Sequence, residues 1–487
     1  MRLPDAAAAR LGLAALAGAA GVLCFAPFGL FWAAPFVWGL FFALLRRAGS
    51  PDAGAMTGFA FGLGFFLCGV SWVHVSLSVF GGMPWWLASP AAFLFCAVMA
   101  LFPMAAGWAF KRWQPPGLVR EALFFAVLLA LGDWLRGWVF TGFPWLALGY
   151  SQAPPSPLAG FAPLFGVFGL SLLVALAGAL LLHWRTGVAF IAVTVALGFG
   201  LHRVPWTTPE GEPVSVALVQ GNVPQEMKFN PQAFLRTLAL YLDLIEKYPA
   251  QLTILPETAL PSFFDSLPPH YVEALNKAVR ARGGDLIAGT LTGDRDAYWN
   301  SAVTLGVSPT QTYSKRHLVP FGEFIPPGFA WFMAQANIPM SSFSRGPVVQ
   351  PPLAVAGRQV AVNICYEDVF GDEIIAALPQ AGILVNLSNT AWFGRSLAQP
   401  QHLQIARMRA IETGRPMLRA TNTGMTAIVG ADGSLQGVLE PFTTGVLRGE
   451  VRAYTGMTPY ARWGNLAFLV LAMLALIAAL WPQRTLR

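Results

Sequence analysis

Three side chains that can perform covalent catalysis each follow a predicted strand in one region of the chain. They are Glu257 after residues 252–256, Lys315 after residues 311–314, and Cys365 after residues 360–364. A thiol nucleophile needs a base that takes its proton and a positive charge that stabilises the oxyanion formed on its target. These residue types therefore predict nucleophilic catalysis by Cys365, with Glu257 as general base and Lys315 as the stabilising cation.

Each of the three residues also has a purely structural interpretation. Glu257 could cap a helix, Lys315 could be a solvated surface charge, and Cys365 could belong to the core, because free cysteine is among the most buried residue types. Their positions at three strand ends of one region favour the catalytic interpretation.

Cys365 has no disulfide partner in its own region, because the other three cysteines fall in apolar segments. These are Cys24, Cys68 and Cys96. The six histidines are scattered, and no Cys-x-x-Cys or His-x-x-x-His spacing occurs, so we expect no metal site. No glycine-rich phosphate-binding motif follows a predicted strand, so we expect no nucleotide and no other cofactor.

The composition is that of a membrane protein, but its apolar residues are concentrated in two parts of the chain. Of 487 residues, 55% are hydrophobic and only 11% are charged, against about 25% charged in a typical globular domain. We predict a membrane domain of seven helices over residues 1–203, a soluble α/β domain over 204–460, and an eighth membrane helix with a basic tail over 461–487. In the soluble part, strands and helices alternate with short connections, which indicates a layered fold.

Eight apolar stretches are long enough, or nearly so, to cross a bilayer. They cover roughly residues 11–25, 28–45, 54–79, 85–110, 119–139, 161–182, 187–202 and 464–481. Basic residues flank alternate ends of these stretches, as the positive-inside rule requires. They are Arg2, Arg10, Arg46, Arg47, Lys111, Arg112, Arg120, Arg185, Arg484 and Arg487. This pattern predicts cytoplasmic termini and an extracytoplasmic soluble domain. The net charge of +7 is explained in the same way, and without a basic patch interleaved with aromatics we expect no nucleic-acid partner.

Three segments around these residues resemble a known family. Leu255-Pro256-Glu257-Thr258, residues 315–323 and Cys365-Tyr366-Glu367 are similar to the Glu-Lys-Cys segments of the nitrilase, or carbon–nitrogen hydrolase, superfamily. Together with seven spans before this domain and one after it, the whole chain resembles the apolipoprotein N-acyltransferases of the bacterial inner membrane. The resemblance implies an αββα nitrilase-like sandwich inserted between the transmembrane helices.

The same resemblance implies supporting residues around the triad. Glu323 would orient the lysine and the base, and Tyr366 would offer its backbone N–H to the oxyanion, with Glu367 beside it. Three aromatic residues, Phe229, Trp331 and Trp392, would contact substrate or belong to a lid that covers residues 324–344. Phe229 departs from the family pattern, which often has a tryptophan there.

The implied reaction is a two-step transfer of a fatty acyl chain through a thioester on Cys365. The donor would be a phospholipid of the bilayer, and the acceptor the N-terminal α-amine of a diacylglyceryl-cysteine apolipoprotein. A membrane-tethered amidase or nitrilase, with water as acceptor, is an alternative. A transporter with an extracytoplasmic binding domain is another, although the spans lack the ionisable residues typical of transport paths.

Overall fold

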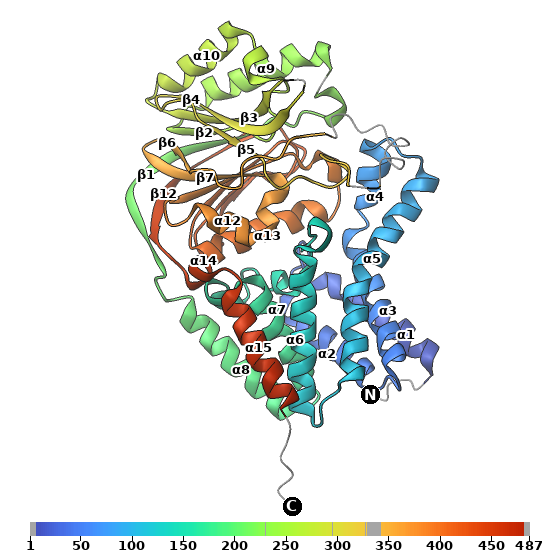
Figure 1. The fold of residues 1–487 in the computed structure, drawn as a ribbon. Coiled ribbons are helices and arrows are strands. Elements are labelled where there is room, and N and C mark those ends of the chain that lie inside the picture. Colours follow the sequence, from blue (N-terminus) through green and yellow to red (C-terminus); the bar gives the residue numbers. More distant parts are fainter. Residues whose placement is uncertain (1–5, 229, 295, 327, 329–341, 482–487) are drawn as a thin grey trace, which may run out of the picture. The chain divides into compact units, whose positions relative to one another are not determined.

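The computed structural model describes residues 6–228, 230–294, 296–326, 328 and 342–481. The chain divides into two compact units. We call residues 1–74, 86–204 and 462–487 the helical unit, and residues 75–85 and 205–461 the sheet unit. Figure 1 labels many of the helices and strands of both units.

In the helical unit, an α-helix overlaps each of the eight predicted apolar stretches. They are α1 (Ala7–Gly21), α2 (Ala34–Arg46), α3 (Pro51–Val70), α5 (Trp85–Arg112), α6 (Leu118–Arg136), α7 (Ala162–Leu180), α8 (Trp184–Leu201) and α15 (Leu466–Leu480). Among the described residues, five helical stretches are long and apolar enough to cross a membrane, and α2 and α15 are shorter apolar helices. This part of the fold is consistent with a membrane domain, whereas the number of crossings stays a prediction.

Two predicted stretches extend beyond their helices by six residues or more. The second was expected from residue 28, but α2 begins at Ala34, because Gly29 adopts a left-handed φ of 67° that an α-helix cannot contain. The third was expected to reach residue 79, but α3 ends at Val70 and a separate π-helical turn follows over Ser76–Phe80. That turn belongs to the sheet unit.

Asp133 and Arg136 form an i,i+3 ion pair on α6, with 2.8 Å between Oδ1 and Nη2. The second carboxylate oxygen of Asp133 accepts hydrogen bonds from the backbone N–H of Leu148 and the hydroxyl of Ser171, both at 2.8 Å. The pair therefore ties α6 to the segment that follows it and to α7.

The sheet unit is built from two six-stranded sheets. The first has the order β12-β1-β2-β3-β4-β5, with bounds Gly445–Gly456, Thr207–Gln220, Leu252–Ile254, Asp285–Gly293, Tyr298–Gly306 and Thr312–Ser314. The second has the order β11-β10-β9-β8-β7-β6, with bounds Leu435–Val438, Ala427–Val429, Met417–Thr421, Ile383–Ser388, Arg358–Ile364 and Leu353–Val355. Strands β7, β8 and β9 are mutually parallel.

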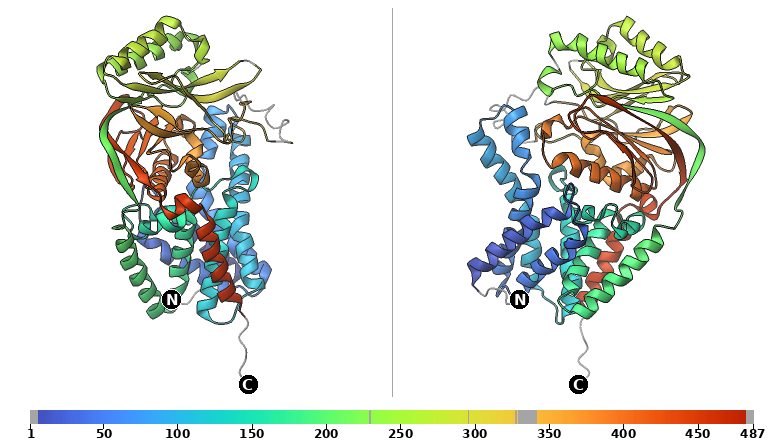
Figure 2. Two further views of the ribbon diagram at one scale, coloured as in Figure 1. Left: turned by 60° about the vertical axis from the view of Figure 1, so that its left-hand side comes forward. Right: turned by 180° about the vertical axis from the view of Figure 1, so that it is seen from behind.

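Apolar side chains from both sheets share one core, so the sheets pack face to face. The outer face of the first sheet is covered by α9 (Pro231–Lys247) and α10 (Pro269–Arg280). The outer face of the second is covered by α12 (Gly371–Ile374) and α13 (Ala398–Thr413). These four layers, visible in Figures 1 and 2, confirm the predicted αββα sandwich.

Strands β11 and β12 were not predicted. Few of their residues are buried, and β12 carries Arg448, Glu450 and Arg452 at alternating positions, so they lack the apolar runs that mark the central strands. Strand β12 nevertheless pairs with β1 along almost its whole length and forms one edge of the first sheet. Short helices α4 (Val73–Val75) and α14 (Pro459–Trp463) lie at the sequence boundaries between the units.

Candidate active site

Cys365 occupies a sharp turn at the end of a central strand. Strand β7 ends at Ile364, and Cys365 opens a single 3₁₀ turn that runs to Val369. Its φ of 54° is in the left-handed region, which non-glycine residues rarely adopt and which is often a mark of a functional site. The residue is 8% exposed, so its side chain is largely buried.

The Glu367 carboxylate joins this turn to the segment that carries Lys315. Each of its two oxygens accepts two hydrogen bonds. Oε2 accepts from Ile364 N at 2.6 Å and Tyr313 Oη at 2.9 Å, and Oε1 accepts from Arg316 N at 2.8 Å and His317 N at 3.1 Å. Burial raises the pKa of Glu367, and the backbone donors and Lys315 oppose that rise. With its oxygens used in this way, Glu367 positions backbone and does not face a reacting group.

Lys315 lies between two carboxylates. Its Nζ is 2.8 Å from Glu323 Oε1 and 3.4 Å from Glu257 Oε1, and the side chain is 1% exposed. Burial alone would lower the pKa of Lys315, but the Glu323 and Glu257 carboxylates raise it above its ordinary value. The side chain is therefore a fixed ammonium at neutral pH.

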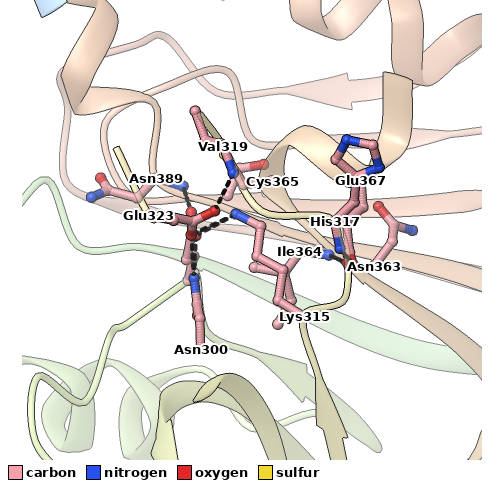
Figure 3. Close-up of polar contacts among 12 residues, drawn as sticks. Asn300, Lys315, His317, Val319, Glu323, Asn363, Ile364, Cys365, Glu367 and Asn389 are labelled. Atoms are coloured by element: carbon pink, nitrogen blue, oxygen red, sulfur yellow. Dashed lines mark hydrogen bonds and ion pairs between the residues drawn. The ribbon is translucent and has the colours of Figure 1, made fainter. Parts of the chain in front are cut away.

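The Glu257 carboxylate is oriented by donors from three elements. Besides Lys315, Asn300 on β4 donates to Oε1 at 2.7 Å, and the backbone N–H of Asn389 donates to Oε2 at 2.7 Å. Asn300 also donates to Glu323 Oε1 at 3.1 Å (Figure 3). One amide thus bridges both carboxylates, which fixes the placement of Glu257 relative to Glu323 and Lys315.

The charges of Glu257 and Lys315 affect the pKa of the Cys365 thiol. Burial raises the pKa of Cys365, the Glu257 carboxylate raises it further, and Lys315 acts in the opposite direction. Cys365 therefore rests as a thiol, so any reaction through its thiolate would need a base that removes the proton. Within the described residues, no three His, Cys, Asp or Glu side chains gather as a possible metal site.

Two further residues of this cluster were not assigned a role from the sequence. Lys228 is 2% exposed and donates from Nζ to the backbone carbonyl of Glu257 at 2.9 Å. Burial lowers its pKa to about 8, and the charges of Glu257 and Cys365 oppose that decrease. Asn300 was missed because a single amide on a predicted strand carries no chemical signal until its neighbours are known.

Of the four aromatic residues predicted around the triad, the structure describes two, Tyr366 and Trp392. Tyr366 is buried beside Cys365 and packs edge-on against Phe370, with ring centroids 5.2 Å apart. Trp392 packs edge-on against Phe80 at 5.9 Å. Phe229 and Trp331 lie outside the described residues, as does most of the predicted lid over residues 324–344.

The two packed sheets with paired helices on each outer face define a domain of the carbon–nitrogen hydrolase class. A model of the carbon–nitrogen hydrolase family matches residues 215–460, and a model of the apolipoprotein N-acyltransferase N-terminal domain matches residues 17–180. Apolipoprotein N-acyltransferases from Nitrosomonas europaea and Ralstonia nicotianae are 48% and 45% identical, over 97% of this chain in each case and 97% and 93% of theirs. A third, from Chromobacterium violaceum, is 45% identical over 97% of this chain and 94% of its own. The chain belongs to the apolipoprotein N-acyltransferase family, and it is an acyltransferase enzyme.

Proposed function

We propose that this enzyme transfers a fatty acyl chain from a phospholipid to the N-terminal α-amine of a diacylglyceryl-cysteine apolipoprotein, through a thioester on Cys365. The names of its relatives support lipoprotein and lipid substrates in general. The site and the resemblance of the segments around it to the family support a phospholipid as donor and a thioester as intermediate.

In the first half-reaction, Cys365 Sγ attacks the ester carbonyl while its proton passes to Glu257. The oxyanion that forms is stabilised by the Lys315 ammonium and by backbone N–H groups of the Cys365 turn, including that of Tyr366. When the carbon–oxygen bond breaks, the proton on Glu257 goes to the departing lysophospholipid oxygen, and the acyl group stays on sulfur.

In the second half-reaction, the neutral α-amine attacks the thioester carbonyl. Its surplus proton goes to Glu257 and then to the leaving Cys365 sulfur, so an amide and the free thiol result. Splitting the exchange into two displacements lets one base and one oxyanion site serve both steps.

The observation that carries this proposal is that three donors fix the Glu257 carboxylate close enough to act electrostatically on a thiol that is protonated at rest. A carboxylate that receives Asn300, Lys315 and Asn389 donors cannot rotate freely, and a thiol with a raised pKa requires such a base. A transporter with a binding domain would have no use for this arrangement.

We also propose that the termini are cytoplasmic and that the sheet unit is periplasmic, in the bacterial inner membrane. Contacts inside the helical unit bring several of its basic residues together at one end of that unit, which supports this orientation. Lys111 donates to the carbonyl of Arg46 at 3.2 Å, and Arg46 pairs with Glu121 at the start of α6. Arg120 donates to the carbonyls of Ala479 and Trp481 at the end of α15. The C-terminal ends of α2, α5 and α15 therefore lie together, as an even number of spans requires.

The test is the intact mass of the full chain in phospholipid micelles, with and without a diacylglyceryl-cysteine lipopeptide. We expect a gain of one acyl chain on Cys365, which the lipopeptide removes while becoming acylated. Neither Cys365→Ala nor Glu257→Gln should show the gain. An adduct lost to water as fast as to the lipopeptide would refute transfer and favour the hydrolase alternative. Labelling of single introduced cysteines from either side of the membrane tests the orientation.

A further inference from the structure

A second group of buried charges lies beside the Cys365 turn and has no part in the mechanism above. Asp368, three residues after Cys365 in the same 3₁₀ turn, is fully buried. Its Oδ1 is 2.7 Å from His402 Nε2 on α13, and its Oδ2 is 2.9 Å from Arg419 Nη1 on β9. Burying a charge pair is costly unless geometry and further hydrogen bonds compensate, so the pair needs an explanation.

The strand register places Arg419 at one end of a row of polar residues. Asn363 on β7 pairs with Asn386 on β8, and Asn386 pairs with Arg419 on β9. Their neighbours on the same face, such as Leu384 and Met417, belong to the apolar core beneath α12 and α13. Three polar side chains therefore lie in a row across three neighbouring strands, beside apolar residues of the same face and next to the strand end that carries Cys365.

Hydrogen bonds along this row fix the orientation of the Asn386 amide. Its Oδ1 accepts from Arg419 Nη1 at 2.7 Å and from Ser388 Oγ at 2.6 Å. Because the guanidinium can only donate, the amide nitrogen must point the other way. There Nδ2 donates to Asn363 Oδ1 at 2.6 Å and to the backbone carbonyl of Cys365 at 3.2 Å.

We infer that Asp368, Arg419 and Asn386 are positioning residues that hold the Cys365 carbonyl, and with it the left-handed turn that presents the thiol to Glu257 and Lys315. Asp368 anchors the guanidinium, the guanidinium orients the amide, and the amide holds the carbonyl. A residue at φ 54° persists only where its surroundings determine it. The inference rests on the proposed role of Cys365 as nucleophile.

The test measures alkylation of Cys365 by iodoacetamide in the full chain, read by peptide mass so that the other cysteines do not interfere. In this reaction sulfur displaces iodide and the thiol proton passes to base or solvent, so no lipid substrate is involved. We compare Arg419→Met, Asn386→Leu and the double variant Asp368→Asn/Arg419→Met with the wild type, together with their melting temperatures.

The double variant separates positioning from charge balance. Arg419→Met alone leaves the Asp368 charge without its arginine, so it should melt well below the wild type. Asp368→Asn/Arg419→Met removes both charges and should recover much of that stability, yet it still lacks the donor that orients Asn386. We expect its alkylation rate, like that of Asn386→Leu, to fall on the order of 10²-fold, the typical effect of misplacing a reacting group by an ångström.

The pH dependence of alkylation adds a signature that a general loss of stability would not produce. Asn386→Leu changes no charge, so a shift of its half-maximal rate along the pH axis reports that the thiol has moved relative to Glu257 and Lys315, the charges that act most on its pKa. If the double variant is alkylated at the wild-type rate, the Asp368–Arg419 pair serves charge balance alone and the inference is overturned. A folded Asn386→Leu variant with unchanged rate and profile would do the same.

A matched control is Arg409→Met/Glu412→Gln, which removes another buried ion pair, 3.0 Å long, from α13. It should leave the alkylation rate and its pH profile unchanged. If the wild type takes no acyl group from phospholipid, the proposed function fails, but the comparison of alkylation rates among the variants still decides this inference.

Discussion

Lys228 donates a hydrogen bond from its buried ammonium to the backbone carbonyl of Glu257, at 2.9 Å. Burial lowers its pKa from 10.5 to about 8, so this contact has a cost in stability that depends on pH. Below pH 8 the lysine is charged in both the folded and the unfolded chain. Between about 8 and 10.5 the unfolded chain binds the additional proton, so folding is increasingly favoured as the pH rises.

Lys228→Met should therefore change how stability depends on pH. Relative to the variant, the free energy of unfolding of the wild type should rise by up to about 3 kcal/mol between pH 8 and 10.5. Melting temperatures of both proteins across this range check the sign. Parallel curves would show that Lys228 keeps its ordinary pKa. We also expect the variant to form thioester more slowly, because the Glu257 backbone loses its anchor.

Glu367 and Tyr313 allow a test of whether the carboxylate positions backbone. Glu367→Gln replaces one acceptor oxygen by a donor, which must then face at least one of three backbone N–H groups. We expect a loss of about 3 kcal/mol in the free energy of unfolding, as for a broken buried network. Tyr313→Phe removes a single hydrogen bond and should cost about 1 kcal/mol. Equal melting temperatures for the two variants would contradict this role.

Much of the architecture could be predicted from the sequence because it depends on the length and spacing of apolar runs. Long apolar runs predicted the helices of the helical unit, and short β-branched runs ending in polar residues predicted the strands before Glu257 and Cys365. Strand β12 was not predicted because charged residues stand at its alternating positions. Its pairing with β1 also joins residues more than two hundred positions apart in the sequence.

The details of the site were less accessible, for a geometric reason. The contact of Lys228 with the Glu257 carbonyl joins residues 29 positions apart. The polar row that ends at Arg419 depends on the register of three parallel strands. Neither the reach of a buried lysine nor the register of a central sheet follows from local residue patterns, since both are set by packing.

Glu323→Gln tests how the Lys315 ammonium is held. Glu323 accepts from Lys315 and Asn300 through Oε1 and from the backbone of Val319 through Oε2 at 2.8 Å, so a glutamine must turn its NH₂ group towards a donor on one side. We expect thioester formation to slow on the order of 10²-fold and the melting temperature to fall. The raised pKa of Lys315 stabilises the fold fully below pH 10.5 and loses this effect only as the pH rises further. The part of the stability difference due to Lys315 should therefore stay constant through the neutral range. A steady decrease between pH 7 and 9 would indicate that the lysine titrates there.

A substitution at Gly289 tests whether activity survives a displacement of the Glu257 backbone when no functional group of the site is changed. A Cβ at this position on β3 would lie 2.3 Å from the carbonyl oxygen of Pro256 and 2.7 Å from the Cα of Glu257, so the turn that carries the base would have to move. We expect Gly289→Ala to lose about 2 kcal/mol in the free energy of unfolding, as overpacking does, and to slow thioester formation on the order of 10²-fold.

The matched control for this substitution is Gly322→Ala, directly before Glu323. There the nearest atom to a new Cβ is 3.5 Å away, which is an ordinary contact. This variant should keep both the melting temperature and the rate of the wild type. Because both alanines add one methyl group beside a proposed catalytic or supporting carboxylate, a difference between them isolates the placement of the Glu257 backbone. Equal rates in the two variants would mean that Glu257 does not need its observed position.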